Sequence, residues 1–278
     1  FLLVTACKKS FFVWPSLFDN NQIEWSSVKA FLRLAFPSLL VGLVAMSSML
    51  LIRTVVARLY GFSGAGYFDA AWSISAMYVM LFLPAMQSYL LPSMRAERVE
   101  SQTGQLLDQA TRLALIVSVP LITAMIVFKP LILRVLYSGE FSQTIDLLRW
   151  SFLGDYFRIL GWVLATYLLA RMEMKAYVVH EILWNLVFVV AGIWLLNSGL
   201  SGAGIAYLLA YSAYLASLVI RIYVLDGVRI DSTIVLNTIG GGLIILTAGL
   251  LTWDSATIEW TGAVMIPIAG IFSVLIMR

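Results

Sequence analysis

The sequence predicts an all-α membrane protein, a polytopic bundle of about eight transmembrane helices. Hydrophobic residues make up 61% of the 278-residue chain and charged residues only 12%, about half the share in a soluble domain. Apolar stretches of roughly 18–25 residues recur, which is the length an α-helix needs to cross a bilayer core of about 30 Å. These stretches do not alternate polar with apolar residues, which excludes the strands of a transmembrane barrel.

The predicted spans follow one another through short loops. The chain opens with seven apolar residues that end at Lys8 and Lys9; we interpret them as the end of a preceding helix and expect the sequence to be a fragment. A segment with Trp14 and Pro15 follows, typical of a membrane interface. The eight spans are then expected at approximately residues 31–51, 66–91, 106–128, 147–170, 177–196, 202–222, 233–251 and 260–277.

The spans group into three regions. Residues 1–30 are expected to form the helix end and a cytoplasmic, interfacial segment between lobes. Residues 31–225 would form a six-helix transmembrane bundle, and residues 226–278 two additional transmembrane helices. No loop between spans is long enough to hold a soluble domain.

Basic residues in the loops predict which side of the membrane each loop faces. With eight spans, alternate loops place eleven Lys and Arg residues on one side and four on the other. The four are Arg58, Lys129, Arg134 and Arg149. Because cytoplasmic loops carry the excess of basic residues, the side with eleven is predicted to be cytoplasmic.

Several functions are excluded by what the sequence lacks. Cys7 is the only cysteine and His180 the only histidine, so neither a disulfide framework nor a multi-ligand Cys/His metal site is expected. The net charge of +3 comes without a long basic run, so nucleic acid is not an expected partner. No H-E-x-x-H, G-x-S-x-G or paired aspartate motif occurs within the spans. We therefore predict no catalytic residues, no metal, no cofactor and no enzyme activity.

Five charged residues within the predicted spans are the candidate functional residues. A charge inside a span costs roughly 2.5–3.5 kcal/mol on insertion scales and usually has a function. Arg53 ends the first span and Asp69 starts the second, so both lie on the same side of the membrane and are expected to approach each other. Arg53 reaching for the interface is an equally good interpretation.

The other three candidates lie in the fourth and fifth spans. Asp155 and Arg158 are three residues apart and share a helix face, which allows them to pair. They are either a self-neutralised pair or the polar face of an aqueous cavity, where the arginine would bind phosphate and the carboxylate a proton or cation. Glu181 is either a carboxylate favoured by the N-terminal dipole of its helix or a coupling residue.

Two stretches resemble a known family. Residues 66–94 read GYFDAAWSISAMYVMLFLPAMQSYLLPSM and residues 154–181 read GDYFRILGWVLATYLLARMEMKAYVVHE. They resemble the O-antigen and enterobacterial-common-antigen flippases (Wzx-type translocases) of the multidrug/oligosaccharidyl-lipid/polysaccharide exporter superfamily. The residues that carry the resemblance are Gly66, Tyr67, Ala70, Trp72, Ile74, Ser75, Tyr78, Tyr89 and Pro92, then Gly154, Asp155, Arg158 and Trp162. Arg53 also stands where this family tends to place an arginine.

The resemblance implies a transporter of the bacterial inner membrane that works by alternating access. Such proteins move undecaprenyl-diphosphate-linked oligosaccharides between leaflets through a cavity between two six-helix lobes. This chain would be the C-terminal lobe, with Arg53 and Arg158 binding the diphosphate and Asp69, Asp155 and Glu181 lining the cavity or coupling an ion. Its expected partners are the lipid-linked oligosaccharide, membrane lipids, an N-terminal helical lobe and other polysaccharide-assembly proteins.

Two alternative functions remain open. One is a drug/cation antiporter of the same superfamily, which would favour a cavity dominated by carboxylates rather than arginines. The other is an integral-membrane polysaccharide polymerase or glycosyltransferase, which would carry a large extracytoplasmic loop that this sequence does not contain.

Overall fold

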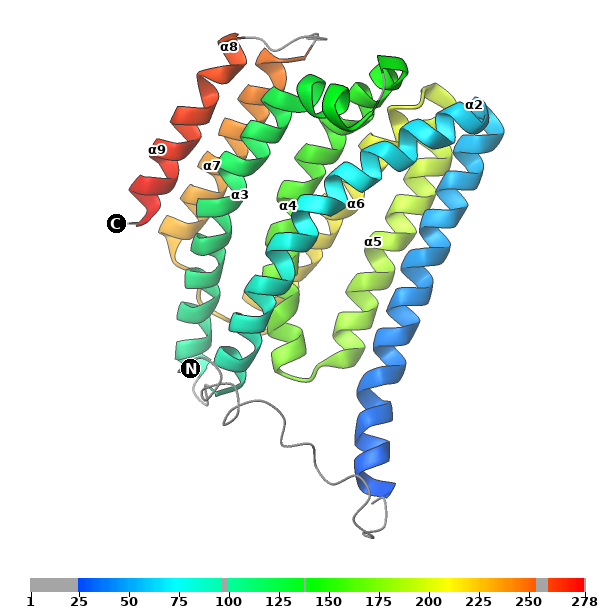
Figure 1. The fold of residues 1–278 in the computed structure, drawn as a ribbon. Coiled ribbons are helices and arrows are strands. Elements are labelled where there is room, and N and C mark those ends of the chain that lie inside the picture. Colours follow the sequence, from blue (N-terminus) through cyan, green and yellow to red (C-terminus); the bar gives the residue numbers. More distant parts are fainter. Residues whose placement is uncertain (1–24, 97–99, 138, 254–259, 278) are drawn as a thin grey trace, which may run out of the picture. The chain divides into compact units, whose positions relative to one another are not determined.

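The computed structural model describes residues 25–96, 100–137, 139–253 and 260–277, and all regular structure within these ranges is helical (Figure 1). Six of the described helices are long and apolar enough to cross a membrane, which confirms the all-α, polytopic fold. The chain divides into two compact units, Phe1–Phe36 and Pro37–Arg278. The first unit contributes the helical residues 25–36, and the second unit holds the rest of the described residues.

The first two predicted spans lie in one bent helix, α2 (Trp25–Ala96), rather than in two helices joined by a loop. The bend is at Gly61, whose φ of 70° and ψ of −174° suit a residue without Cβ. We call residues 37–60 the first arm of α2 and residues 62–96 the second arm. The span Ala35–Met94 has 60 residues, about 90 Å of helix, enough for two crossings.

The centre of the bundle is α4 (Thr144–Ala170), which packs on α3 (Glu100–Leu136) and α6 (Gly202–Val219), while α6 also packs on α5 (Met174–Leu195). Short 3₁₀ segments, η1 (Gly139–Gln143) and η2 (Leu196–Ser198), precede α4 and follow α5. A π-helical segment, η3 (Ile220–Leu225), continues α6. The six predicted crossings between residues 31 and 222 therefore share one core.

Two glycines of α4 allow α6 to approach closely. A Cβ on Gly154 would lie 2.5 Å from Cδ1 of Tyr207, and one on Gly161 would lie 2.7 Å from Cδ1 of Tyr214. Both tyrosines are buried. Because the glycines and the tyrosines are each seven residues apart, two turns of each helix interlock in the same way.

The C-terminal helices pack mainly on α3: α7 (Ser232–Leu251) and α9 (Met265–Met277), with the short α8 (Trp260–Ala263) before α9 (Figure 1). Asp231 caps the start of α7 by accepting a hydrogen bond from the Thr233 amide. Lys129 of α3 is fully buried, and its ammonium donates to the carbonyl and hydroxyl of Thr252, at the end of α7. A cation there is favoured by the helix dipole.

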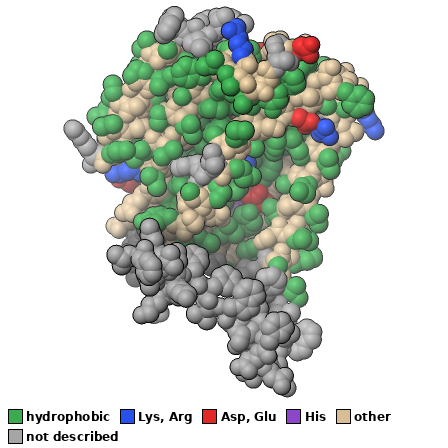
Figure 2. Space-filling model, viewed as in Figure 1, with side chains coloured by type: hydrophobic (Ala, Val, Ile, Leu, Met, Phe, Trp, Pro, Cys, Tyr) green, Lys and Arg blue, Asp and Glu red, His purple; other side chains and the backbone are tan. Residues whose placement is uncertain are grey.

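The number of crossings differs from the prediction of eight. The first two merge into α2, and the last is the 13-residue α9, shorter than a full span, so six helices qualify among the described residues. The surface agrees with a lipid environment: side chains on the face shown in Figure 2 are mostly hydrophobic. Val190, Leu236 and Leu275 are among the large apolar residues that remain exposed.

Candidate functional site

An exposed ion pair joins the two arms of α2. Arg53 precedes Gly61 by eight residues and Asp69 follows it by eight, so each lies about 12 Å along its arm from the bend. The Arg53 Nε atom is 2.8 Å from an Asp69 carboxylate oxygen. The prediction that the two side chains meet is confirmed, and the bend in one helix is the reason.

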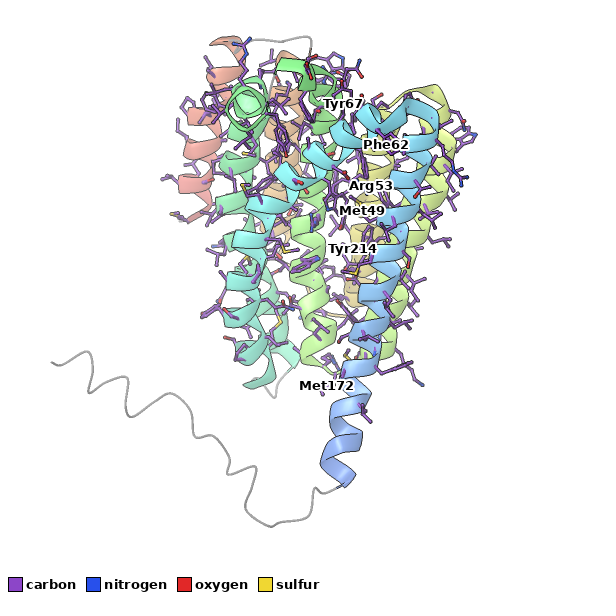
Figure 3. All side chains as sticks on the ribbon, turned by 45° about the vertical axis from the view of Figure 1, so that its right-hand side comes forward. Met49, Arg53, Phe62, Tyr67, Met172 and Tyr214 are labelled. Atoms are coloured by element: carbon purple, nitrogen blue, oxygen red, sulfur yellow. The ribbon has the colours of Figure 1, made fainter. Side chains whose placement is uncertain are left out.

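The Arg53 side chain stays half exposed, at 51%, although it is paired. Figure 3 shows it on the first arm, one turn from Met49, with Phe62 at the bend. Met46 and Leu50, on the same arm, are exposed apolar residues. The guanidinium is thus held by Asp69 at an apolar face, away from the end of the span, with hydrogen-bond donors still accessible.

The second group of charges is buried in the bundle and centres on Asp155 of α4. Its carboxylate accepts hydrogen bonds from the hydroxyls of Ser75, at 2.6 and 2.8 Å, Tyr78, at 2.5 Å, and Tyr207, at 2.6 Å. These donors come from the second arm of α2 and from α6. One carboxylate therefore ties three helices together, and Asp155 itself has no exposed surface.

Arg158 pairs with Asp155, with 3.8 Å between its Nη1 atom and the carboxylate oxygen, so the predicted i, i+3 pairing is confirmed. Its Nη1 atom also contacts the Tyr207 hydroxyl at 3.1 Å, and its guanidinium lies 5.6 Å from the centre of the Tyr211 ring. Only 6% of Arg158 is exposed. In this conformation the pair lies within helix packing and does not face an open cavity, because tyrosine side chains of α6 cover it.

Glu181 is also buried, at 7% exposure, on α5. Its carboxylate accepts hydrogen bonds from the Trp184 indole and the Tyr214 hydroxyl, both at 2.7 Å. Because α5 begins at Met174, Glu181 lies two turns inside the helix. The interpretation of Glu181 as a dipole-favoured carboxylate at the helix N-terminus is therefore wrong, since that effect is limited to the first turn.

The charges in this interior do not balance. Asp155 and Glu181 are two carboxylates, and among the described residues Arg158 is the guanidinium that acts on both of them. Asp155 has this cation as a direct neighbour, whereas the hydrogen-bond donors to Glu181 are neutral. Binding one proton or one monovalent cation would neutralise the group, which is what an ion-coupling site requires.

Sequence reasoning missed the tyrosines that complete this group. Tyr207, Tyr211 and Tyr214 recur at intervals of four and three residues, so they lie on one face of α6. The Tyr211 ring stacks on Trp184, with 5.0 Å between ring centres. Their helical spacing, matched with the glycines of α4, was the available signal; their partners come from helices distant in the sequence.

A cavity of about 10 Å³ lies beside this network, lined by Ser75, Trp72 and Tyr207 among others. It has room for about one water molecule. A water there would be next to the Ser75 hydroxyl that binds Asp155. The cavity is far too small for a lipid head group.

Similar proteins share this architecture. A structure described as lipid II flippase MurJ in an inward closed conformation superposes with a TM-score of 0.70 at 17% identity, over 91% of this chain and 54% of that one. A transporter of the MOP superfamily from Pyrococcus furiosus gives 0.59 at 18%, over 90% and 62%. A multidrug resistance transporter of the MATE family gives 0.58 at 18%, over 90% and 62%.

The class of fold is thus the helical membrane fold that these MOP-superfamily structures share. The sequence profile of the MurJ lipid II flippase family matches residues 2–272, and the chain belongs to this family. The members of this family are transporters, not enzymes. Family membership and the six apolar helices together indicate that this chain is a multi-pass protein of the inner membrane. Lipid III flippases of Escherichia coli K12 and Shigella flexneri are each 23% identical over 167 residues, or 59% of this chain. The chain spans 40% of the length of these relatives.

Proposed function

We propose that this chain forms part of a flippase for undecaprenyl-diphosphate-linked oligosaccharides, of the O-antigen or common-antigen type. The family membership supports a lipid-linked precursor as substrate. The similarity to relatives named lipid III flippases supports a finer choice within that class. The remaining length of these relatives supports a second helical lobe, so that this chain supplies one wall of a cavity.

The single observation that carries the proposal is the exposed position of the Arg53 guanidinium. This guanidinium is half exposed on an otherwise apolar face, about 12 Å from a helix bend. An anionic partner is needed to offset the free-energy cost of placing its charge in the membrane. Asp69 neutralises it within the bent helix while the substrate is absent. A diphosphate carries more negative charge than one carboxylate and accepts two parallel hydrogen bonds from a guanidinium, so it competes for Arg53.

The buried charges are assigned a different function in the proposal. Glu181 and Asp155 share one compensating cation, so they are the residues proposed to take up the coupling ion. Arg158 is buried against Asp155 and Tyr207, and a direct contact with diphosphate would need α6 to move away from α4. Its proposed binding of substrate therefore belongs to an open conformation, whereas Arg53 is accessible in the present one.

A drug/cation antiporter is the second candidate, favoured by the fold shared with MATE transporters. A cationic drug would be repelled by Arg53 and attracted by Asp69. The two functions therefore predict opposite consequences for the same pair of residues, which makes the pair the natural target for an experiment.

The test is complementation of a strain that lacks its O-antigen flippase, using the transporter that contains this chain with Arg53→Ala. Surface O-antigen should fall at least tenfold, on the order of the 1.4 kcal/mol that one charged hydrogen bond contributes. Arg58→Ala is the matched control, because Arg58 is exposed on the same arm but lies nearer the bend. Both variants are compared at equal membrane abundance. Full complementation by Arg53→Ala, or drug resistance that depends on Asp69, would contradict the proposal.

A further inference from the structure

The buried group of Asp155, Arg158 and Glu181 has one more carboxylate than it has cations, and the contacts show which carboxylate lacks a cation. Asp155 has the Nη1 atom of Arg158 3.8 Å away and accepts hydrogen bonds from three hydroxyls. Its negative charge is therefore compensated in place. The excess charge falls on Glu181, which is 7% exposed and accepts hydrogen bonds from the Trp184 indole and the Tyr214 hydroxyl.

The surroundings of Glu181 offer little to balance an ionised carboxylate. The titratable groups of α5 and α6 that act on it are tyrosines, which are neutral near neutral pH: Tyr177, Tyr211 and Tyr214. Arg158 acts on Glu181 from α4, but its direct ion-pair partner is Asp155. His180 is turned to Ser217 of α6, with 2.8 Å between Nδ1 and Oγ. A buried charge in such a place is costly, so the group neutralises instead.

The contacts of the Glu181 carboxylate suit a proton better than a metal cation. Tyr214 donates a hydrogen bond to Oε1 and Trp184 donates one to Oε2, so both oxygens already face a hydrogen atom. A metal cation needs lone pairs around it, whereas the indole N–H of Trp184 can only donate. A proton adds to one oxygen and needs a single acceptor for the new O–H bond.

Asn185 supplies an unused acceptor one turn further along α5. Its side chain is 2% exposed, and its Nδ2 atom donates to the Glu181 carbonyl at 2.8 Å. This contact fixes the orientation of the amide, because Oδ1 in the same place would face another acceptor. The Oδ1 atom is left buried without a hydrogen-bond partner in the described part of the chain. Side chains four residues apart on a helix are within reach of each other, and a buried oxygen without a donor is rare.

We infer that Glu181 binds a proton in this conformation and that Asn185 positions the resulting acid by accepting its O–H through Oδ1. The inference rests on the proposed function, in which Glu181 and Asp155 take up the coupling ion, and it names the ion as a proton and the site as Glu181. One carboxylate oxygen bonds to a proton taken from water, and no other covalent bond changes. With Asp155 paired to Arg158, the whole group then carries no net charge.

The face of α6 that covers Glu181 also covers Arg158. Tyr214, labelled in Figure 3, contacts Glu181, and Tyr207, two turns earlier on α6, contacts Arg158 at 3.1 Å. Movement of α6 away from α4 and α5 would therefore open both groups to water together. Glu181 would lose its proton in the same step that frees Arg158 to bind a phosphate, which links the ion to the anionic substrate.

The test is infrared spectroscopy of the purified chain in detergent, without substrate. A protonated carboxyl gives a C=O band that an ionised carboxylate lacks, and this band shifts in heavy water. At about pH 7, where a glutamate in water is ionised, the protein should show such a band, and Glu181→Gln should remove it. Glu140→Gln is the matched control, because Glu140 is exposed in η1 and its substitution should leave the band unchanged.

Two further variants test the inference if Glu181→Gln does not fold. Asn185→Leu removes the acceptor of the O–H, so the band should disappear at a pH about one unit lower, a tenfold weaker affinity for the proton. Tyr214→Phe removes a hydrogen-bond donor that stabilises the ionised form, so the band should persist to higher pH. A purely structural role of these residues does not predict shifts of opposite sign.

Sodium chloride and choline chloride at equal concentration distinguish a proton from a metal cation, and the band should be the same in both salts. Loss of the band in sodium alone, a band that Glu181→Gln leaves intact, or shifts of the same sign in the other two variants would overturn the inference. These measurements involve neither substrate nor transport. Their outcome is therefore independent of the complementation experiment with Arg53→Ala.

Discussion

The buried pair of Asp155 and Arg158 leads to the sharpest prediction on stability. Arg158→Met removes the cation and keeps the volume of the side chain similar, so that Asp155 is left as an uncompensated charge. Two unit charges 3.8 Å apart attract by about 4 kcal/mol at an effective dielectric constant of about 20. Breaking a buried pair in this way typically costs about 3–5 kcal/mol.

The hydrogen bonds of Asp155 reduce this cost. Three hydroxyls continue to donate to the carboxylate after Arg158 is removed, so the lower end of the range applies. We expect a loss of about 3 kcal/mol in the free energy of unfolding. On the scale of soluble domains this lowers Tm by roughly 6–12 °C.

The assay is thermal unfolding in detergent, followed by intrinsic tryptophan fluorescence. Asp155→Asn combined with Arg158→Met removes both charges, and should recover at least half of the lost stability. Arg53→Met is the matched control: its partner Asp69 is 38% exposed, so the change should be below about 1 kcal/mol. An Arg158→Met protein as stable as the control, or a double variant no more stable than Arg158→Met, would refute the reasoning.

Three further predictions concern helix packing, the Glu181 site and the start of α7. Gly154→Ala forces a Cβ against a tyrosine ring of α6 and should lower stability by about 1–3 kcal/mol. Gly42→Ala, with open space around it, should be neutral or stabilising. The two variants are compared by their Tm values. Trp184→Phe removes one hydrogen bond to Glu181 and should lower stability by about 1–3 kcal/mol in denaturant titrations. The hydrogen bond from the Thr233 amide lowers the pKa of Asp231, so its capping of α7 is present above the ordinary carboxyl pKa and lost as pH falls through the lowered value. Hydrogen exchange at the start of α7 should therefore increase in acid, and Asp231→Asn should reduce this change.

Several parts of the site follow from sequence alone because they are local. Asp155 and Arg158 are three residues apart, and residues at this spacing share a face in any α-helix. Their pairing is therefore independent of the rest of the fold. Arg53 and Asp69 are equally spaced from Gly61, and two antiparallel crossings bring such residues to the same depth. That the two crossings form one bent helix did not follow from the pattern, because a helix end and a sharp bend at glycine look alike in a sequence.

The burial of the charges was decided by contacts between distant segments. Ser75 and Tyr78 reach Asp155 from about 80 residues away, and Tyr214 reaches Glu181 from another helix. Hydrophobic periodicity does not encode these approaches, because nearly every face of a transmembrane helix is apolar. For the same reason the sequence left open whether Arg158 lies in an open cavity or in a packed core.

By itself, the sequence determined that this protein is a helical membrane protein and which of the candidate charges lie inside its spans, and it predicted how the loops are sided. The energetic reason is that only a backbone that satisfies its own hydrogen bonds is stable in lipid. A charge within a span is costly and rare, so it is easily recognised in the sequence. The tertiary structure decided that Arg53 remains accessible while Asp155, Arg158 and Glu181 are covered by tyrosines. It also brought Asp108 and Arg229 into the lining of one pocket. Those outcomes depend on close packing between α3, α4, α6 and the loop before α7. The spacing of residues along the sequence does not determine how closely these segments approach one another.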